Sequence, residues 1–114
     1  MIAWNLLTSE EQLITIAEKS FLTPQIIFKH STRCSISAMA LGRFERQWDL
    51  ENKSLNPFLL DLLSFRAISN EIAAKFKIEH ASPQILLIQN GICTYATSHN
   101  DINVADLKEQ LIKV

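Results

Sequence analysis

The chain has little of what disordered or disulfide-stabilised proteins need. Its 114 residues include 2 Gly, 3 Pro and 2 Cys. So few turn-breaking residues, together with 47% hydrophobic residues, exclude a disordered chain and favour a single domain over residues 1–114. Two cysteines are too few for the disulfide framework of a small secreted protein. Free thiols are typical of the reducing cytoplasm, which is therefore the expected location.

An excess of charge of one sign is also missing. The 11 Lys+Arg and 12 Asp+Glu give a formal net charge of −1 at pH 7. Binding to nucleic-acid phosphates requires a surplus of basic residues, so nucleic acid is not an expected partner. No apolar run reaches the roughly 18 residues of a membrane-spanning helix, and residues 1–7 lack the positive flank of a signal peptide. We expect no membrane partner, and the sequence leaves the oligomeric state open.

Helical periodicity recurs in four segments. The apolar stripes that predict them are Leu13/Ile16/Ala17, Ile36/Ala40/Phe44/Trp48, Ile68/Ile72/Phe76 and Val104/Leu107/Leu111. Thr8 and Glu11 have the spacing of a capping box, which predicts the start of the first helix. Asn103 is the expected N-cap of the last helix, which we place at about 103–112. Met39 adjoins the second stripe, so we expect it to pack in or beside the core.

Strand patterns lie between the predicted helices. We expect strands at Gln25–His30, Phe58–Leu63, Gln84–Gln89 and Ile92–Thr97. The first contains three consecutive apolar residues, as in a central strand buried on both faces. Phe58–Leu63 suits strand or helix by periodicity, and its place in the chain favours strand, with a loop over 49–57 before it. Asn90-Gly91 predicts a type I′ hairpin turn between the last two strands.

The order of these segments favours a thioredoxin-like fold. A helix, a strand–helix–strand unit, a further helix, a hairpin and a last helix follow one another. We therefore predict one α/β domain whose central mixed four-stranded sheet is flanked by helices, one of them N-terminal.

Cys34 is the main functional candidate. It follows the first central strand and precedes a helix, at the carboxyl edge of the sheet where α/β folds place their sites. The positive end of a helix stabilises a thiolate, which is the reactive form of cysteine. Arg33, Lys29 and His30 would add to this effect if their side chains point the same way. The alternative is that Cys34 is a small buried apolar residue.

Two further features support chemistry at Cys34. Ser37 stands where a Cys-x-x-Cys enzyme has its second thiol, so the pattern predicts monothiol chemistry that needs an external thiol for release. Its hydroxyl either bonds to the thiolate or is simply solvated or capping. Ser82-Pro83 precedes a strand. In this fold class a cis proline there lies beside the active cysteine and leaves the preceding backbone free to bind a peptide or thiol.

The remaining polar candidates have simpler interpretations. Cys93 alternates with its neighbours in a strand, which favours packing over a redox role. A metal site built from Cys34, Cys93, His30 and His99 is conceivable, but no pair of them has ligand spacing, so no metal is predicted. His80 and His99 are expected to be polar loop residues, and Trp4 and Trp48 to be packing residues.

The sequence resembles a known family, the YtxJ-like proteins of the bacillithiol system, also called monothiol bacilliredoxins. The matching segments are Phe28–Cys34, Ile36–Leu41, Leu60–Leu63, Ile68–Asn70, His80, Ser82–Gln84 and Ser98–His99. The family has a thioredoxin-like fold, and its single active cysteine matches Cys34. It usually has proline after that cysteine, whereas this chain has Ser35. The change restores a backbone amide and frees φ, which puts the reactivity of the thiol in question but not its position.

The resemblance implies an activity: reduction of mixed disulfides between client proteins and bacillithiol, a small thiol that some bacteria use in place of glutathione. Bacillithiol would be a co-substrate, and no bound cofactor is expected. Two other hypotheses stay open. One is a thioredoxin-like adaptor in a stress response that keeps Cys34 for recognition. The other is an iron–sulfur carrier, for which the sequence offers no further ligands.

Overall fold

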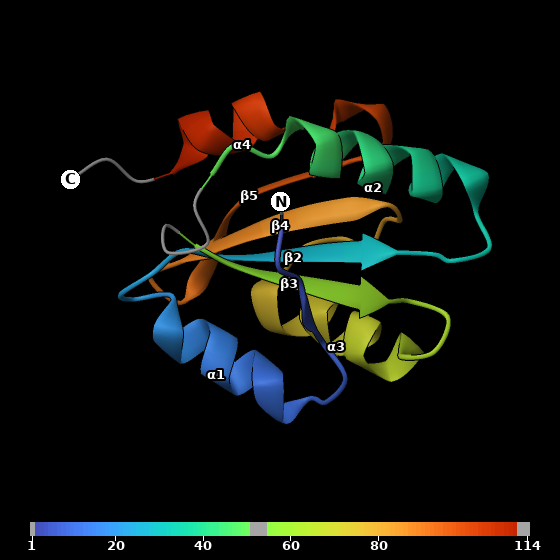
Figure 1. Ribbon diagram of the computed structural model, residues 1–114. Helices are drawn as coiled ribbons and strands as arrows, with labels where there is room; N and C mark the ends of the chain where they lie inside the picture. The colour runs from blue at the N-terminus through green and yellow to red at the C-terminus, as the bar shows by residue number, and fades with distance from the viewer. Residues whose placement is uncertain (1, 51–54, 112–114) are drawn as a thin grey trace.

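The computed structural model describes residues 2–50 and 55–111. Its elements are β1 (Asn5–Leu6), α1 (Glu11–Lys19), β2 (Gln25–His30), α2 (Ser35–Gln47), β3 (Asn56–Asp61), α3 (Arg66–Phe76), β4 (Gln84–Gln89), β5 (Ile92–Ser98), a 3-10 turn η1 (His99–Asp101) and α4 (Val104–Gln110). The strands form one sheet in the order β1-β3-β2-β4-β5. Figure 1 shows the sheet between two layers of helices.

The predicted α/β class is confirmed, but the sheet has five strands instead of four. The added strand, β1, has two residues, too few to show a periodicity, and it pairs in parallel with β3 at the sheet edge. β3 runs from Asn56 to Asp61, so it begins within the predicted loop and ends two residues early. Its parallel register against β2, from Gln25 opposite Asn56, sets that start. Residues 51–54 of the predicted loop lie outside the described part.

β2 occupies the centre of the sheet, as predicted. It is parallel to β3 and antiparallel to β4, and its first five residues are buried. The β4–β5 hairpin also forms as predicted: Asn90 and Gly91 have φ of 53° and 81°, the positive values that a type I′ turn requires.

Each face of the sheet has its own apolar core. α2 and α4 cover one face and α1 and α3 the other (Figure 1). The α2 core includes Ile26, Phe28, Ala40, Phe44, Trp48, Ile85, Leu87, Val104 and Leu107, with Trp4 packed against it. The α3 core includes Leu13, Ile16, Ile27, Leu60, Ile68, Ile72, Phe76, Leu86 and Ile88. Alternate residues of β2 and β4 therefore point to opposite cores.

Two details of the helices differ from the sequence prediction. α1 has no Thr8–Glu11 capping box, because the Oε1 atom of Gln12 accepts the Thr8 and Ser9 amides at 2.7 and 2.9 Å. In α2 the buried stripe is Ser37, Ala40 and Phe44. Ile36 and Met39 are 55% and 68% exposed, so the expectation that Met39 packs in the core is wrong. The predicted stripe is correct for Ala40, Phe44 and Trp48, which are buried, and wrong for Ile36 at its start.

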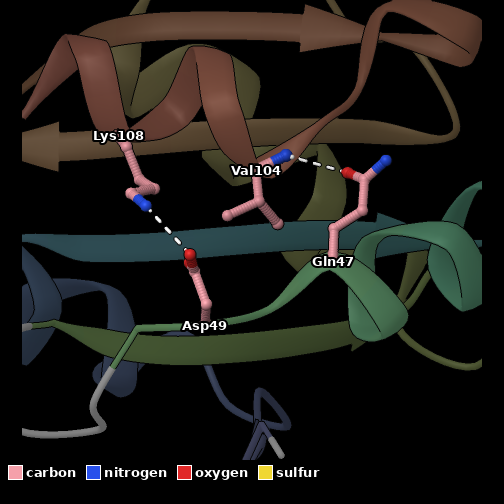
Figure 2. A network of polar contacts seen from close by, with 4 residues as sticks. All are labelled: Gln47, Asp49, Val104 and Lys108. Carbon is pink, nitrogen blue, oxygen red and sulfur yellow. Dashed lines mark hydrogen bonds and ion pairs between the residues drawn. The ribbon is translucent and has the colours of Figure 1, made fainter.

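Polar contacts join the end of α2 to α4. Gln47 Oε1 accepts the amide of Val104 at 3.1 Å, and Lys108 Nζ lies 3.0 Å from a carboxylate oxygen of Asp49 (Figure 2). Asn103 is the N-cap of α4, as predicted, and accepts the amide of Asp106 at 2.8 Å. Within the described ranges, none of the helices combines the length and apolar character needed to cross a bilayer.

Candidate functional site

Cys34 lies just past the carboxyl end of β2, as the N-cap of α2. Its backbone is extended, with φ −108° and ψ 119°. Its amide donates to the carbonyl of Ser31 at 3.2 Å, and its own carbonyl accepts the first α-helical bond from Ala38 at 3.0 Å. The residue is partly exposed. The thiol is therefore accessible, and it stands at the positive end of a 13-residue helix.

The loop before Cys34 is held from inside by Ser37. This side chain is fully buried, and its Oγ accepts the Ser31 amide at 3.0 Å and lies 2.7 Å from Nδ1 of His30. Ser37 is therefore not solvated, and among the described residues its hydroxyl contacts His30 and Ser31 instead of the Cys34 thiol. Because the hydroxyl already accepts from the Ser31 amide, its own hydrogen can donate to Nδ1 of a neutral imidazole, which then carries its proton on Nε2.

His30 is half-buried, and this burial decides its protonation. Desolvation lowers the pKa of the imidazole, while the carboxylates of Asp61 and Glu45 act in the opposite direction. The neutral ring is therefore favoured at pH 7. A neutral ring accepts the Ser37 hydrogen, so the contact between β2 and α2 is an uncharged hydrogen bond.

The basic residues near Cys34 do not point the same way. Arg33 is exposed, and His30 faces α2. Lys29 faces the other side of the sheet, where its Nζ donates to the carbonyl of Ser69 at 3.3 Å and lies 3.3 Å from Nδ1 of His80. Lys29 therefore does not lie on the α2 side with His30, because successive side chains of a strand alternate between faces.

Ser82-Pro83 has a cis peptide bond. It immediately precedes β4, whose first residue pairs with Lys29 of β2. Since β2 and β4 are antiparallel, the start of β4 and the end of β2 lie at the same edge of the sheet, and this places Pro83 and the loop to Cys34 at that edge. Pro83 accepts the amide of His99 at 3.0 Å. The buried Oγ of Ser82 has no hydrogen-bond partner within residues 2–50 and 55–111.

Cys93 has a different environment. It lies in β5 opposite Ile88 and packs against the α3 core. Its Sγ donates to the carbonyl of Tyr95 at 3.3 Å, and burial raises the pKa of the thiol. A raised pKa leaves little thiolate at pH 7, which favours a packing role.

No group of three potential metal ligands from His, Cys, Asp and Glu occurs in the described part of the chain. Of the four residues weighed as metal ligands, Cys34 and His30 belong to the α2 edge, whereas Cys93 lies in β5 and His99 in η1. His80 and His99 are exposed, as expected of loop residues.

The polar group on the α3 face was not predicted from the sequence. Lys29, His80 and Ser69 come together there, and burial and the nearby charges of Lys29 and Arg66 lower the pKa of His80. The signal was available in Lys29 itself, a charged residue within the most buried strand. A lysine near the end of a strand was instead interpreted as a neighbour of the thiol.

Comparison with known proteins agrees with this architecture. Residues 5–107 match the model of the family described as monothiol bacilliredoxin BrxC. A solved structure of a candidate oxidoreductase with a thioredoxin fold is 30% identical, with 92% of this chain and 90% of that chain covered and a TM-score of 0.78.

Two thioredoxins are similar in fold at lower identity. The Malassezia sympodialis thioredoxin Mala s 13 is 17% identical, with a TM-score of 0.72 and coverage of 94% of this chain and 86% of that chain. The Fasciola hepatica thioredoxin is also 17% identical, with a TM-score of 0.67 and coverage of 94% and 95%. The overall fold of the chain is therefore that of the thioredoxins.

Proposed function

Because the chain belongs to the monothiol bacilliredoxin family, we propose that it removes bacillithiol from client proteins through Cys34. Its class of activity is thiol-disulfide oxidoreductase. The finer reaction is our proposal, with bacillithiol as co-substrate and S-bacillithiolated proteins as clients. Since the reaction needs reduced thiols, we propose the reducing cytoplasm as its location.

The proposed reaction has two exchanges. The Cys34 thiolate attacks the bacillithiol sulfur of the mixed disulfide. A bond forms between Cys34 and bacillithiol, and the client leaves as a thiolate that takes up a proton. A second bacillithiol thiolate then attacks the adduct, which releases the Cys34 thiolate and bacillithiol disulfide. Each step exchanges one S–S bond for another, so the number of disulfides is unchanged and the second bacillithiol takes the place of the client in the released disulfide.

The observation that carries this proposal is the pairing of a partly exposed Cys34 with a buried serine one turn later. Ser37 stands at the position of a second thiol and is bonded to His30 and the Ser31 amide. The other cysteine, Cys93, belongs to the opposite face. An adduct on Cys34 therefore has no resolving thiol beside it, which supports release by an external thiol.

The other site residues have supporting roles in this proposal. His30 and Ser37 hold the loop that leads to Cys34, and Arg33 is the exposed neighbour of Cys34 in the chain. The backbone at Ser82-Pro83 is proposed to bind the incoming disulfide, because it lies at the same sheet edge and precedes the paired residues of β4.

The test is intact-protein mass spectrometry after exposure to bacillithiol disulfide and then to a reducing thiol. We expect one bacillithiol adduct on wild type and on Cys93→Ser, none on Cys34→Ser, and loss of the adduct on reduction. Turnover of a bacillithiolated client should fall to background in Cys34→Ser alone. The matched control is Cys93→Ser, which also removes a single sulfur.

Two results would contradict the proposal. If folded wild-type protein gains no adduct, Cys34 is not a redox site and the adaptor hypothesis takes its place. If glutathione and bacillithiol mixed disulfides turn over at equal rates, the thiol-redox activity stands but the bacillithiol specificity does not.

A further inference from the structure

The segment between α3 and the cis proline has no regular secondary structure, yet side chains from the sheet hold it. Two of these, Lys29 of β2 and Gln84 of β4, are directly opposite each other in the antiparallel register. Opposite residues of antiparallel strands point to the same face. Both side chains are buried, with exposed fractions of 0% and 5%. We refer to them as the Lys29–Gln84 pair.

The pair binds three consecutive residues of this segment. Gln84 donates to the carbonyl of Glu79 at 3.0 Å and accepts the amide of Ala81 at 3.4 Å. Between them, Nδ1 of His80 lies 3.3 Å from Nζ of Lys29. Lys29 also donates to the Ser69 carbonyl of α3 at 3.3 Å. Residues 79–81 are thus held from the sheet directly before Ser82-Pro83.

Stability alone does not explain a lysine at this position. Burial lowers the pKa of Lys29 to about 8, so the ammonium form dominates at pH 7. No carboxylate lies within ion-pair distance of it among the described residues. A buried charge without a counter-ion is costly, and an apolar residue of similar size would often be neutral or stabilising there. An apolar residue would lack the N–H donors with which the ammonium contacts Ser69 and His80.

We propose that Lys29 and Gln84 are positioning residues for thiol exchange, which act by fixing residues 79–81 and thereby the Ser82-Pro83 backbone that receives the disulfide. This inference rests on the proposed function, because it assigns a role within the same site. It extends that function to the opposite face of the sheet, where neither side chain touches the reacting sulfur.

Two neighbouring residues of β2 position different segments of the site. His30 holds the loop that leads to Cys34 from the α2 side. Lys29 holds the segment that leads to Pro83 from the α3 side. Loss of Lys29 should therefore impair the binding of a large disulfide and leave the intrinsic reactivity of the Cys34 thiol unchanged.

The first test is Lys29→Met, which keeps an unbranched apolar stem and removes the donors. We expect KM for a bacillithiolated client to rise on the order of tenfold, with kcat changed less, because a misplaced binding surface weakens substrate binding. The rate at which iodoacetamide alkylates Cys34 should stay within about twofold of wild type, because the N-terminus of α2 is not altered. The urea midpoint should be equal to or above that of wild type.

Two further variants sharpen the test. Lys75→Met makes the same substitution at an exposed lysine of α3 and should change none of these values. Gln84→Met should raise KM in the same direction as Lys29→Met. The double variant should cost less than the product of the two single effects, because both residues act on one segment.

A measurement that does not need turnover separates this inference from the proposed function. The Ala81 amide is bonded to Gln84, so its hydrogen exchange should accelerate in Lys29→Met and Gln84→Met, and not in Lys75→Met. If exchange and KM are both unchanged in the folded variants, the positioning role is overturned. If alkylation of Cys34 slows as much as turnover, the pair acts on the whole site and the inference is also wrong. If exchange accelerates but wild type has no turnover, the proposed function alone fails.

Discussion

On the α2 side of the sheet, His30 meets the buried hydroxyl of Ser37 at 2.7 Å. On the α3 side, the preceding residue, Lys29, meets Ser69 and His80, each at 3.3 Å. The first contact is a short bond between neutral groups beside the candidate nucleophile. The second is a longer contact of a buried ammonium. Adjacent residues of one strand thus lie in very different electrostatic surroundings.

The cysteines follow the same division. Cys34 is partly exposed at a helix start next to the α2 core, whereas Cys93 packs against the α3 core with a raised pKa. Residue type therefore says little about reactivity. Both residues are partly exposed, but only Cys34 stands at the positive end of a helix, whereas burial raises the pKa of the Cys93 thiol.

The largest effect that we expect is a loss of stability when one buried side chain is truncated in either core. Phe44→Ala on the α2 side and Ile72→Ala on the α3 side should lower the free energy of unfolding by about 3–5 and 2–5 kcal/mol. Both side chains are fully buried. Phe44 packs against Trp4, Phe28 and Trp48 at centroid distances of 6.3, 5.7 and 5.6 Å. Urea unfolding measures the loss.

Near-UV circular dichroism distinguishes the two cores. Both tryptophans, Trp4 and Trp48, pack in the α2 core. The near-UV spectrum should therefore change in folded Phe44→Ala and stay close to wild type in folded Ile72→Ala. Equal changes in both variants would mean that the two cores do not respond independently.

An intermediate effect is expected from the charge of Lys29. Its pKa is about 8 in the folded protein and 10.5 without burial. Between pH 8 and 10.5 the unfolded chain binds more protons, so stability should rise with pH across this window. Relative to Lys29→Met, wild type should gain about 1–3 kcal/mol between pH 7.5 and 10.5 in urea unfolding. A difference that does not vary with pH would show that the ammonium is not desolvated.

The last comparison concerns a matched pair of buried serines, of which Ser69 should have the smallest effect. Ser37→Ala leaves the Ser31 amide without its acceptor, so it should cost about 1–3 kcal/mol and reduce turnover. Ser69→Ala keeps the carbonyl that Lys29 uses and loses only a 3.4 Å side-chain contact with His80. Its effect should be at most about 1 kcal/mol, because a single long hydrogen bond is lost and no backbone group is left without a partner. Thermal melts and client turnover measure both, and equal losses would contradict the difference between the two faces.

Local sequence signals predicted a large part of the fold. β2, the hairpin turn and the Asn103 cap depend on neighbouring residues, and the structure confirms all three. The Thr8–Glu11 capping box failed because Gln12 has the same chemistry one residue later. The prediction that this strand begins at Phe58 was wrong, because the start of β3 at Asn56 depends on pairing with β2, which lies more than thirty residues earlier in the chain.

The candidate site was predictable to a similar extent. Cys34 at a helix start and Ser82-Pro83 before a strand are patterns of residue type and spacing, and the structure places both at one sheet edge. The partners of Ser37 were not predictable, because a hydroxyl can be solvated, capping or buried with equal local plausibility. The contacts of His80 with Lys29 and Ser69 join three separate segments, so no local pattern contains them.

By itself, the sequence determined which elements form, in what order, and which cysteine begins a helix, because periodicity, caps and turns are local preferences. Only the tertiary structure decided which helices and which polar partners each polar side chain meets. Register between strands set Lys29 opposite Gln84, and the alternation of side chains sent Lys29 and His30 to opposite cores. Alternation along β2 follows from the strand pattern, but the strand register and the core that each face meets depend on long-range pairing, which local spacing does not contain.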